Sequence, residues 1–584
     1  MALVRPPLSA PGVYIQEVPS GVRTIVGVST SRTVFVGRTQ RGPVGQCVEV
    51  SSYKEFEDNF GGLLADSPMT YAVLDFFLNG GSQAVILRVF NPPAAAPNTS
   101  SASTAGAGSP PASDANPPAT PAANPSPSPQ DFTAYIVPEP PANPPAPPAG
   151  PSSPPAAPAS ASAPAAAPAS PPAAAPVLLA SSPGTWGTRL TFRTNTNNIS
   201  PMVSQHFSTP TWDASDLFNL AITYTDLDKS QDTETFNLVS LNPAAGARYL
   251  GTVLQQSSRY AVLAPPDSPP VDAAAHNQAL KDSAPLSDTA YTQSLDALDR
   301  LDVYNIVCIP PDSFDGDTSA SVYTAAAARC STMKATLIID PPGSWARASA
   351  ITPPENFDSV IGVAPAQLAA QYCALYYPRV CSEDPLMGGM VRTRPASGII
   401  AGIMARTDAT RGVWKAPAGY ETGLANITGL PVTLTDDENG TLNSQGINCL
   451  RSFTGVGPVI WGARTLAGAD VLSSDFKYLP VRRLTNYIEQ TLLRQTRWAV
   501  FEPNDEPLWA QLRLAIGAFM NDLFRQGAFQ GGSRDKAFFV KCDATTTTQD
   551  DINRGIVNIE VGFAPLKPAE FVVIYIEQMA GQTA

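Results

Sequence analysis

The sequence predicts a multidomain α/β and α+β protein, in which mixed sheets are flanked by helices. It also predicts a strand arm at each end for β-augmentation between subunits, and a disordered insertion rich in proline and alanine. Three observations lead to this fold class. Apolar runs alternate with helical segments between Leu295 and Gly402, which is typical of a parallel sheet covered on both faces. Two amphipathic helices precede a strand-like closing run, and almost no large apolar side chain remains from Asn91 to Pro176.

The composition argues against several classes of protein. The 584 residues suffice for about two to four domains. The net charge of -13 argues against a nucleic-acid-binding surface, which would be basic. The seven cysteines form no C-x-x-C pair, so neither a disulfide scaffold nor a zinc site is expected. The first residues carry no apolar signal segment and no long apolar run follows, so we expect a protein made and folded in the cytoplasm.

The first part of the chain is expected to form a small α+β unit that the insertion interrupts. Within the insertion, Asp131–Pro140 is the one stretch that favours a short strand. The insertion is either a display arm or spacer, or a loop expansion tolerated because long surface loops cost little closure entropy. The expected strands are Thr33–Arg41, Gln83–Phe90, Arg189–Asn195, Leu217–Thr225 and Thr235–Val239, and the expected helices are Tyr53–Phe60, Tyr71–Asn79 and Arg248–Arg259.

The middle of the chain alternates strands and helices. We expect buried strands over Asn305–Pro311 and Ala335–Pro342, and helices over Ser321–Ala335 and Ala366–Pro378. Asp312 and Asp340 come where the apolar runs of the two strands end. Enzymes with parallel sheets place catalytic groups at such positions, so the two carboxylates are candidates for acid and base. The alternative is that they cap helices or turns.

The C-terminal part begins with strands in Ile447–Leu466, broken by a glycine-rich turn. A helix over Val481–Ala499 and another over Glu506–Gln526 follow. Each carries apolar residues at helical spacing, which indicates a helix buried along one side. The two stripes are Leu484, Tyr487, Ile488, Leu492 and Trp498, and then Trp509, Leu512, Ile516, Phe519 and Leu523.

Both ends of the chain are strand-like. Gly12–Val18 is bounded by prolines, and the run Gly555–Gln578 alternates apolar and polar residues, with Val557, Ile559, Val561 and Phe563 on one face. A terminal strand has an open row of backbone donors and acceptors, which pair within the fold or with another chain. Two such arms indicate the subunit of a polymer. The residues expected to augment neighbours are Val13, Tyr14, Ile15, Gln16, Glu17 and Val18, and Phe571, Val572, Val573, Ile574, Tyr575, Ile576 and Glu577.

Other motifs carry little chemistry. The two histidines, His206 and His276, lie in neither a catalytic-triad nor a metal-ligand context, and no phosphate-binding loop is present. Basic residues do gather around the two C-terminal helices. They form either a solvated face balanced by nearby acids, or a docking face for an acidic partner. These residues are Arg482, Arg483, Arg494, Arg497, Arg525, Arg534 and Lys536.

Several strings resemble the contractile tail sheath proteins. PGVYIQEVPSGVRTIVGVSTSRTVFVGRTQRGP resembles their N-terminus, and SSPGTWGTRLTF resembles their A-x-x-P-G-x-W-G-N signature, with Thr188 in place of asparagine. PASGIIAGIMARTDATRGVWKAPAG, which follows YYPRV, is similar to their most recognisable segment. YLPVRRLTNYIEQTLLRQTRWAVFEPND and QGAFQGGSRDKAFFVKCD resemble their C-terminal domain. The resemblance covers the chain except the insertion.

The resemblance implies a structural subunit that is not an enzyme and needs no cofactor. Such subunits stack as hexameric rings around an inner tube, lend terminal strands to neighbours, and contract to drive the tube through a target envelope. The implied partners are the chain itself, the inner tube protein, and baseplate and tail terminator or cap proteins, with no nucleic acid and no membrane insertion. The implied particle is a phage-tail-like injection system assembled in the bacterial cytoplasm, or alternatively a phage virion tail. The family places the C-terminal domain against the tube, so the candidates for tube contact are Arg494, Arg497, Arg525, Arg534 and Lys536.

Together these observations suggest a division of the chain. We expect an N-terminal arm at 1–20, an outer α+β domain at 21–90 and 177–290, the insertion at 91–176, an α/β domain at 291–446, a tube-facing domain at 447–566 and a C-terminal arm at 567–584. Gly21 and Ala564–Ala569 are expected to be flexible joints beside the arms. Two other classes remain as alternatives: an α/β enzyme that uses Asp312 or Asp340, and a surface-layer or adhesive protein.

Overall fold

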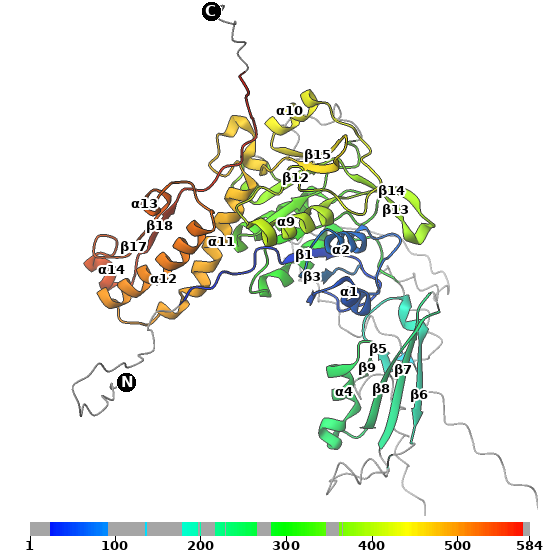
Figure 1. Cartoon of the computed structure of the whole chain (residues 1–584). Coiled ribbons are helices and arrows are strands. Elements are labelled where there is room, and N and C mark those ends of the chain that lie inside the picture. The colour runs from blue at the N-terminus through cyan, green and yellow to red at the C-terminus, as the bar shows by residue number, and fades with distance from the viewer. Residues whose placement is uncertain are drawn as a thin grey trace, which may run out of the picture.

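The computed structural model describes residues 24–91, 135–136, 178–196, 199, 217–227, 229–264, 282–345, 361–364 and 366–575. The predicted N-terminal arm therefore lies outside the described residues, as do most of the insertion and the last nine residues. Three parts are visible in Figure 1: a central α/β body, a module of long strands at one end, and a helical lobe at the side.

An eight-stranded sheet forms the centre of the body, with the order β16-β15-β12-β11-β10-β1-β3-β2. The six inner strands are parallel and the two edge strands are antiparallel to their neighbours. The predicted parallel sheet is thus confirmed. The inner strands are β1 (Thr33–Gly37), β3 (Ala84–Arg88), β10 (Ile306–Cys308), β11 (Thr336–Ile339), β12 (Cys373–Tyr377) and β15 (Ile447–Phe453), and the edges are β2 (Cys47–Val50) and β16 (Gly457–Trp461).

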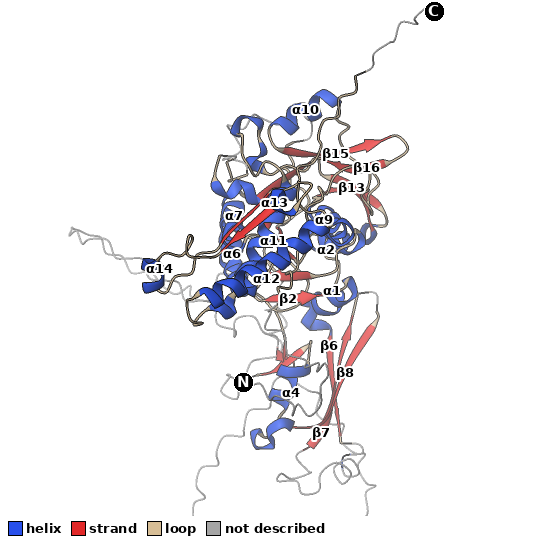
Figure 2. Ribbon diagram, turned by 60° about the vertical axis from the view of Figure 1, so that its left-hand side comes forward, coloured by secondary structure: helices blue, strands red, loops and turns tan. Residues whose placement is uncertain are grey.

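Helices cover both faces of this sheet (Figure 2). Successive residues of one strand enter different cores because side chains alternate across a strand. In β11, Leu337 and Ile339 join one apolar cluster, whereas Ile338 joins the other. The first cluster includes residues of α6 (Asp288–Leu295) and α7 (Ala320–Met333), and the second includes residues of α1 (Tyr53–Phe60), α2 (Pro68–Leu78) and α9 (Ser397–Arg411).

Two expectations about the body are wrong. Ala366–Pro378 was expected to be a helix, but a 3-10 turn (Leu368–Tyr372) leads into β12. This segment fills the gap between β11 and β15, and its ladder to both strands overrides its alanine-rich helix propensity. The expected domain boundaries also cut one sheet, because β1–β3 from the outer domain and β15 and β16 from the C-terminal domain all belong to it. Such long-range strand partners leave no local sequence signal.

The chain between Asn91 and Ser283 contributes a separate module, which we call the outer module. Its antiparallel sheet consists of β6 (Leu190–Asn195), β7 (Leu217–Thr225) and β8 (Gln231–Ser240), packed with α4 (Leu250–Ser257) around buried Trp186. The predicted strands and helix are confirmed with small shifts. A second small sheet joins β5 (Leu178–Ala180) to β9 (Ala261–Leu263) and to β4 (Tyr135–Ile136), which confirms the short strand expected within the insertion.

The remaining elements surround the body and form the helical lobe. A hairpin of β13 (Val380–Asp384) and β14 (Met390–Arg394) and the helix α10 (Asp436–Ser444) flank the sheet. In the lobe, α11 (Leu479–Gln495) ends four residues earlier than expected, while α12 (Glu506–Arg525) ends one residue earlier than expected. The lobe ends with α13 (Arg534–Ala537), β17 (Phe538–Lys541), α14 (Gln549–Asn553) and β18 (Glu560–Phe563).

Candidate functional site

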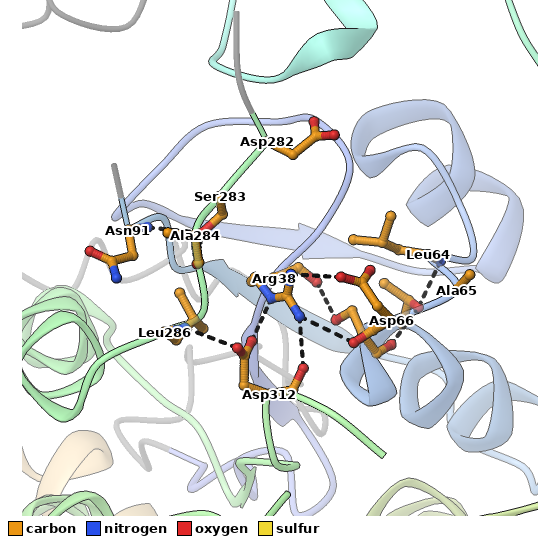
Figure 3. A network of polar contacts seen from close by, with 12 residues as sticks. Arg38, Leu64, Ala65, Asp66, Asn91, Asp282, Ser283, Ala284, Leu286 and Asp312 are labelled. Carbon is orange, nitrogen blue, oxygen red and sulfur yellow. Dashed lines mark hydrogen bonds and ion pairs between the residues drawn. The ribbon is translucent and has the colours of Figure 1, made fainter. Parts of the chain in front are cut away.

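The two aspartates that follow strands hold loops of their own chain. Asp312 receives the guanidinium of Arg38, with an Nε–Oδ1 distance of 2.5 Å, and its other oxygen accepts from the backbone N–H of Leu286 at 2.9 Å. Arg38 also binds the carboxylate of Asp66 at 2.9 Å. Figure 3 shows Arg38 between the two carboxylates. Asp312 therefore links two segments: the chain that returns from the outer module, at Leu286, and the end of β1, at Arg38.

The same network joins the two stems of the outer module (Figure 3). The backbone N–H of Ala284 donates to the carbonyl of Asn91 at 2.9 Å, and the N–H of Asn91 donates to the hydroxyl of Ser283 at 3.0 Å. The point where the chain leaves the body and the point where it returns are thus adjacent. The described segments between them therefore form one insertion into the α/β body.

Asp340 is buried and caps the start of helix α9. Its Oδ1 accepts the backbone N–H groups of Ala396 and Ser397, each at 3.0 Å, at the start of α9. Burial raises the pKa of its carboxyl to about 6, and these hydrogen bonds oppose the rise. The capping role weighed for this residue is confirmed. Asp312 and Asp340 each serve a different loop, and the enzyme hypothesis finds no support in these contacts.

Two of the basic residues on α11 are buried. Arg482 and Arg483 are each 3% exposed as side chains, so they are not part of a solvated helix face. Arg483 holds Asp408 through two bonds of 2.8 and 2.6 Å, and Arg482 pairs with Glu489 at 3.1 Å. Asp408 is as deeply buried as Arg483, whereas Glu489 is 40% exposed. Sequence reasoning missed the burial of both arginines because an arginine on an amphipathic helix is usually solvated.

The five residues proposed for tube contact lie on four different elements. Arg494 pairs with Asp302 and, with the exposed Arg497, lines a cavity of about 440 Å³ beside Arg32 and Glu49. The other three lie elsewhere in the lobe and are exposed. Arg525 ends α12, Arg534 begins α13 and lies over the ring of Phe538 at 5.4 Å, and Lys536 is in the same short helix.

The closing run is a strand only in part. Val557, Ile559, Val561 and Phe563 pack on the lobe as the alternation predicts. Within the described residues of this run the strand is Glu560–Phe563, which pairs with β17, and an isolated bridge joins Pro565 to Phe529 just after it. In the described part of the chain, this two-stranded sheet therefore has open backbone groups on both outer edges.

The predicted C-terminal arm is extended and unpaired in its described part. Phe571, Val572, Val573, Ile574 and Tyr575 are between 69% and 87% exposed, although all five are large apolar residues. Ile576 and Glu577, like Val13–Val18, lie outside the described residues. A run of exposed apolar residues in extended backbone is a segment that needs a partner.

The structure also bears on other sites. Among the described residues no three His, Cys, Asp or Glu side chains come together as metal ligands. No helix in the described ranges is long and apolar enough to cross a membrane. The cysteines, all of which lie in described segments, are free thiols.

Two family models match the chain. The phage tail sheath protein central domain matches residues 285–466 and the phage tail sheath C-terminal domain matches residues 472–578. Curated relatives match over shorter segments. The tail sheath protein of Vibrio phage KVP40 is 30% identical over 181 residues, 31% of this chain and 26% of that protein. A prophage major tail sheath protein of Pseudomonas aeruginosa is 30% identical over 183 residues, 31% of this chain and 44% of that protein. The matched segments thus span less than half of these relatives.

Solved sheath structures share the fold over nearly the whole chain. The helical sheath of the anti-feeding prophage in its contracted state has a TM-score of 0.52 at 19% identity, covering 98% of this chain and 100% of that one. The sheath of the PVC extracellular contractile injection system, also contracted, has a TM-score of 0.51 at 18% identity, covering 98% of each chain. The sequence match of both domains therefore agrees with the fold, and the chain belongs to the contractile tail sheath protein family.

Proposed function

We propose that this chain is the repeating subunit of a contractile sheath. Subunits polymerise as stacked hexameric rings around an inner tube, and the sheath contracts to drive the tube through a target envelope. The observation that carries the proposal is the exposed apolar segment Phe571–Tyr575 in a chain whose hairpin β17–β18 has open edges. One subunit thus carries both a free strand and a sheet that can accept one.

The arms are the proposed means of assembly. Residues Val13–Val18 and Phe571–Glu577 add as strands to neighbouring copies, and β17–β18 is the sheet that receives them. Backbone hydrogen bonds between shared strands survive a rigid-body rotation of the subunits, provided that the chain beside each arm bends. The energy of contraction then comes from the difference between two packings of the same subunit, and no catalytic group is required.

The other proposed partners are the inner tube and the ends of the particle. Tube contact falls to the exposed Arg525, Arg534 and Lys536 before Arg494, because Arg494 is already paired with Asp302. Baseplate and terminator proteins cap the polymer. The proposed location is a phage-tail-like particle assembled in the bacterial cytoplasm.

Within the family, an injection system is favoured over a virion tail. Solved structures that cover 98% of the chain include sheaths of the anti-feeding prophage and of PVC, whereas the curated phage relatives match short segments. Purified particles decide between the two, because a virion carries a DNA-filled head and an injection system does not.

The proposal is tested by electron microscopy of the chain expressed with its tube and baseplate proteins. Striated hollow tubes are expected from the wild type. Replacing Val573 by proline removes a backbone donor from the arm and is expected to abolish the tubes. Replacing the same residue by threonine keeps the donor and the strand propensity, so tubes are expected to remain. Dispersed subunits from the wild type in the presence of all partners would reject the sheath function.

A further inference from the structure

The chain leaves the helical lobe before it becomes the C-terminal arm. Ala564 is the last residue bonded to the lobe through its backbone on both sides: it donates to the carbonyl of Ala537 at 2.8 Å and accepts from Gln530 at 2.9 Å. A bridge between Phe529 and Pro565 follows. The chain then crosses to the α/β body, as the dark red segment in Figure 1 shows.

The crossing segment, Leu566–Ala569, spans a hollow rather than a packed core. It forms one wall of a cavity of about 840 Å³. The loop after α9, with Trp414 and Lys415, helix α10 and Trp461 of β16 supply other walls. Dispersion contacts from one side only hold a segment weakly, so its position depends on how its ends are fixed.

Glu570 fixes the far end of this segment. Its two carboxylate oxygens accept from Nε and Nη2 of Arg464 at 2.8 and 2.6 Å, which is the bidentate geometry of a strong ion pair. The hydroxyl of Tyr478 lies 3.3 Å from the same carboxylate. The side chain of Arg464 is 1% exposed and that of Glu570 is 15% exposed. Water therefore screens this pair far less than a surface ion pair.

Arg464 is itself held by the central sheet. Its remaining nitrogen, Nη1, donates to the carbonyl of Asn443 at 2.7 Å and to the carboxylate of Asp470 at 3.0 Å. Its backbone N–H and carbonyl are both bound by the side chain of Asn448, at 2.7 and 2.8 Å, and Asn448 also donates to Leu375 of β12. A continuous chain of polar contacts thus runs from Glu570 to the parallel sheet.

We propose that Arg464 and Glu570 are a positioning pair that sets the direction in which the C-terminal arm leaves the subunit. The inference rests on the proposed function, in which the arm pairs with a neighbouring copy. It also revises the expected joint: Ala564–Ala569 is held at both ends, by Ala564 and by the neighbouring Glu570, so the direction of the arm is fixed at Glu570. The arm then takes its direction from the α/β body and transmits force to the sheet through Arg464.

Positioning has an energetic consequence for assembly. An arm that leaves the body in one direction loses less conformational freedom on pairing than an arm that also samples the space around the cavity. The pair therefore strengthens strand sharing without contacting the neighbour. Glu570 rather than Arg464 is the residue to change, because Arg464 also holds carbonyl groups of the body.

The first measurement uses the isolated full-length subunit and two spin labels. In a background with the half-buried Cys47 and Cys381 changed to serine, cysteines replace exposed Ile574 in the arm and exposed Thr441 in α10. The wild-type pair is expected to give one narrow distance distribution. Glu570→Ala is expected to broaden it about twofold or more, since the arm then samples further states. Asp470→Ala, which removes the other carboxylate on Arg464 but leaves the arm bound, is expected to keep it narrow.

The second measurement is the concentration at which subunits polymerise. Glu570→Ala is expected to raise it by about tenfold or more, and Asp470→Ala by less than about twofold. Equal thermal unfolding of the two variants checks that neither acts through the fold. A narrow distribution in Glu570→Ala, or equal broadening in both variants, would overturn the inference. If the wild type forms no sheath, the proposed function fails, while the spin labels still decide whether Glu570 positions the arm.

Discussion

The eight-stranded sheet and the hairpin β17–β18 are opposite kinds of sheet in one chain. The inner strands of the large sheet have partners on both sides and apolar cores on both faces. The hairpin has one pairing, open outer edges and residues that are mostly half-buried or exposed. The inner strands of the first region are fully paired within a single subunit. The second has the form of a sheet that further strands can complete, which is the feature that the proposed strand sharing between subunits requires.

The largest loss of stability is expected where the closed region holds a buried charge. Arg394 binds Asp75 at 2.8 Å, and the two side chains are 3% and 1% exposed. Arg394→Ala leaves this carboxylate without its cation, which costs about 3–5 kcal/mol. The matched control is Arg411→Ala, which breaks an ion pair with Glu421 of the same length between exposed side chains and costs about 0–1 kcal/mol. Urea denaturation of the isolated subunit measures both, and equal losses would contradict the contrast.

The same truncation in the two sheets is expected to have unequal effects. Ile338 is fully buried in β11, so Ile338→Ala removes apolar contacts and leaves a cavity, at a cost of about 2–5 kcal/mol. Val561 in β18 is half-buried, and Val561→Ala is expected to cost about 1 kcal/mol or less. The two variants are compared by their denaturation midpoints. An equally large shift for Val561→Ala and Ile338→Ala would mean that β17 and β18 are as fully packed in the free subunit as the large sheet is.

The next effect depends on pH. Burial raises the pKa of Asp340 to about 6, so the folded state binds its proton more tightly than the unfolded chain does. The stability contributed by the protonated form is therefore present below about pH 4 and is lost as the pH rises to about 6. The amide side chain of the variant Asp340→Asn does not titrate. The stability of the wild type relative to this variant is expected to fall by about 2–3 kcal/mol across that window. A difference that is flat or rises with pH would refute the assignment.

The smallest effect on stability is expected in the arm. Val573 is 69% exposed and its segment is unpaired in the subunit, so Val573→Pro is expected to change the free energy of unfolding by less than about 0.5 kcal/mol. The same substitution is expected to abolish sheath formation. A large loss of subunit stability would show that the arm belongs to the closed region.

Sequence periodicity predicted the elements whose own pattern decides their structure. Helix α12 begins at the expected residue and ends one residue before the expected end, because its apolar stripe repeats along its whole length, and Val557–Phe563 packs as its alternation indicates. β12 was mistaken for a helix because its environment, two neighbouring strands, determines its backbone. The sheet that joins residues 33–88 to residues 306–461 also depends on partners hundreds of residues apart.

The candidate site was harder to predict than the fold. The exposed apolar arm was visible in the sequence, whereas its attachment through Arg464 and Glu570 was missed. A signal did exist: Arg464 is a lone charge within the largely uncharged run GPVIWGARTLAGA, and a buried arginine requires a partner. The identity of that partner, 106 residues further along, cannot be read from such a pattern.

The exposed arm has a consequence for the life of the free subunit. Phe571–Tyr575 combines aromatic and β-branched residues with no charge and no proline, which is the composition of segments that aggregate as stacked strands. Lys567 and Glu570 flank it on one side only within the described chain. Aggregation of the free subunit is therefore expected to be lowest when assembly is as fast as synthesis. Overproduction without its partners is expected to yield insoluble protein.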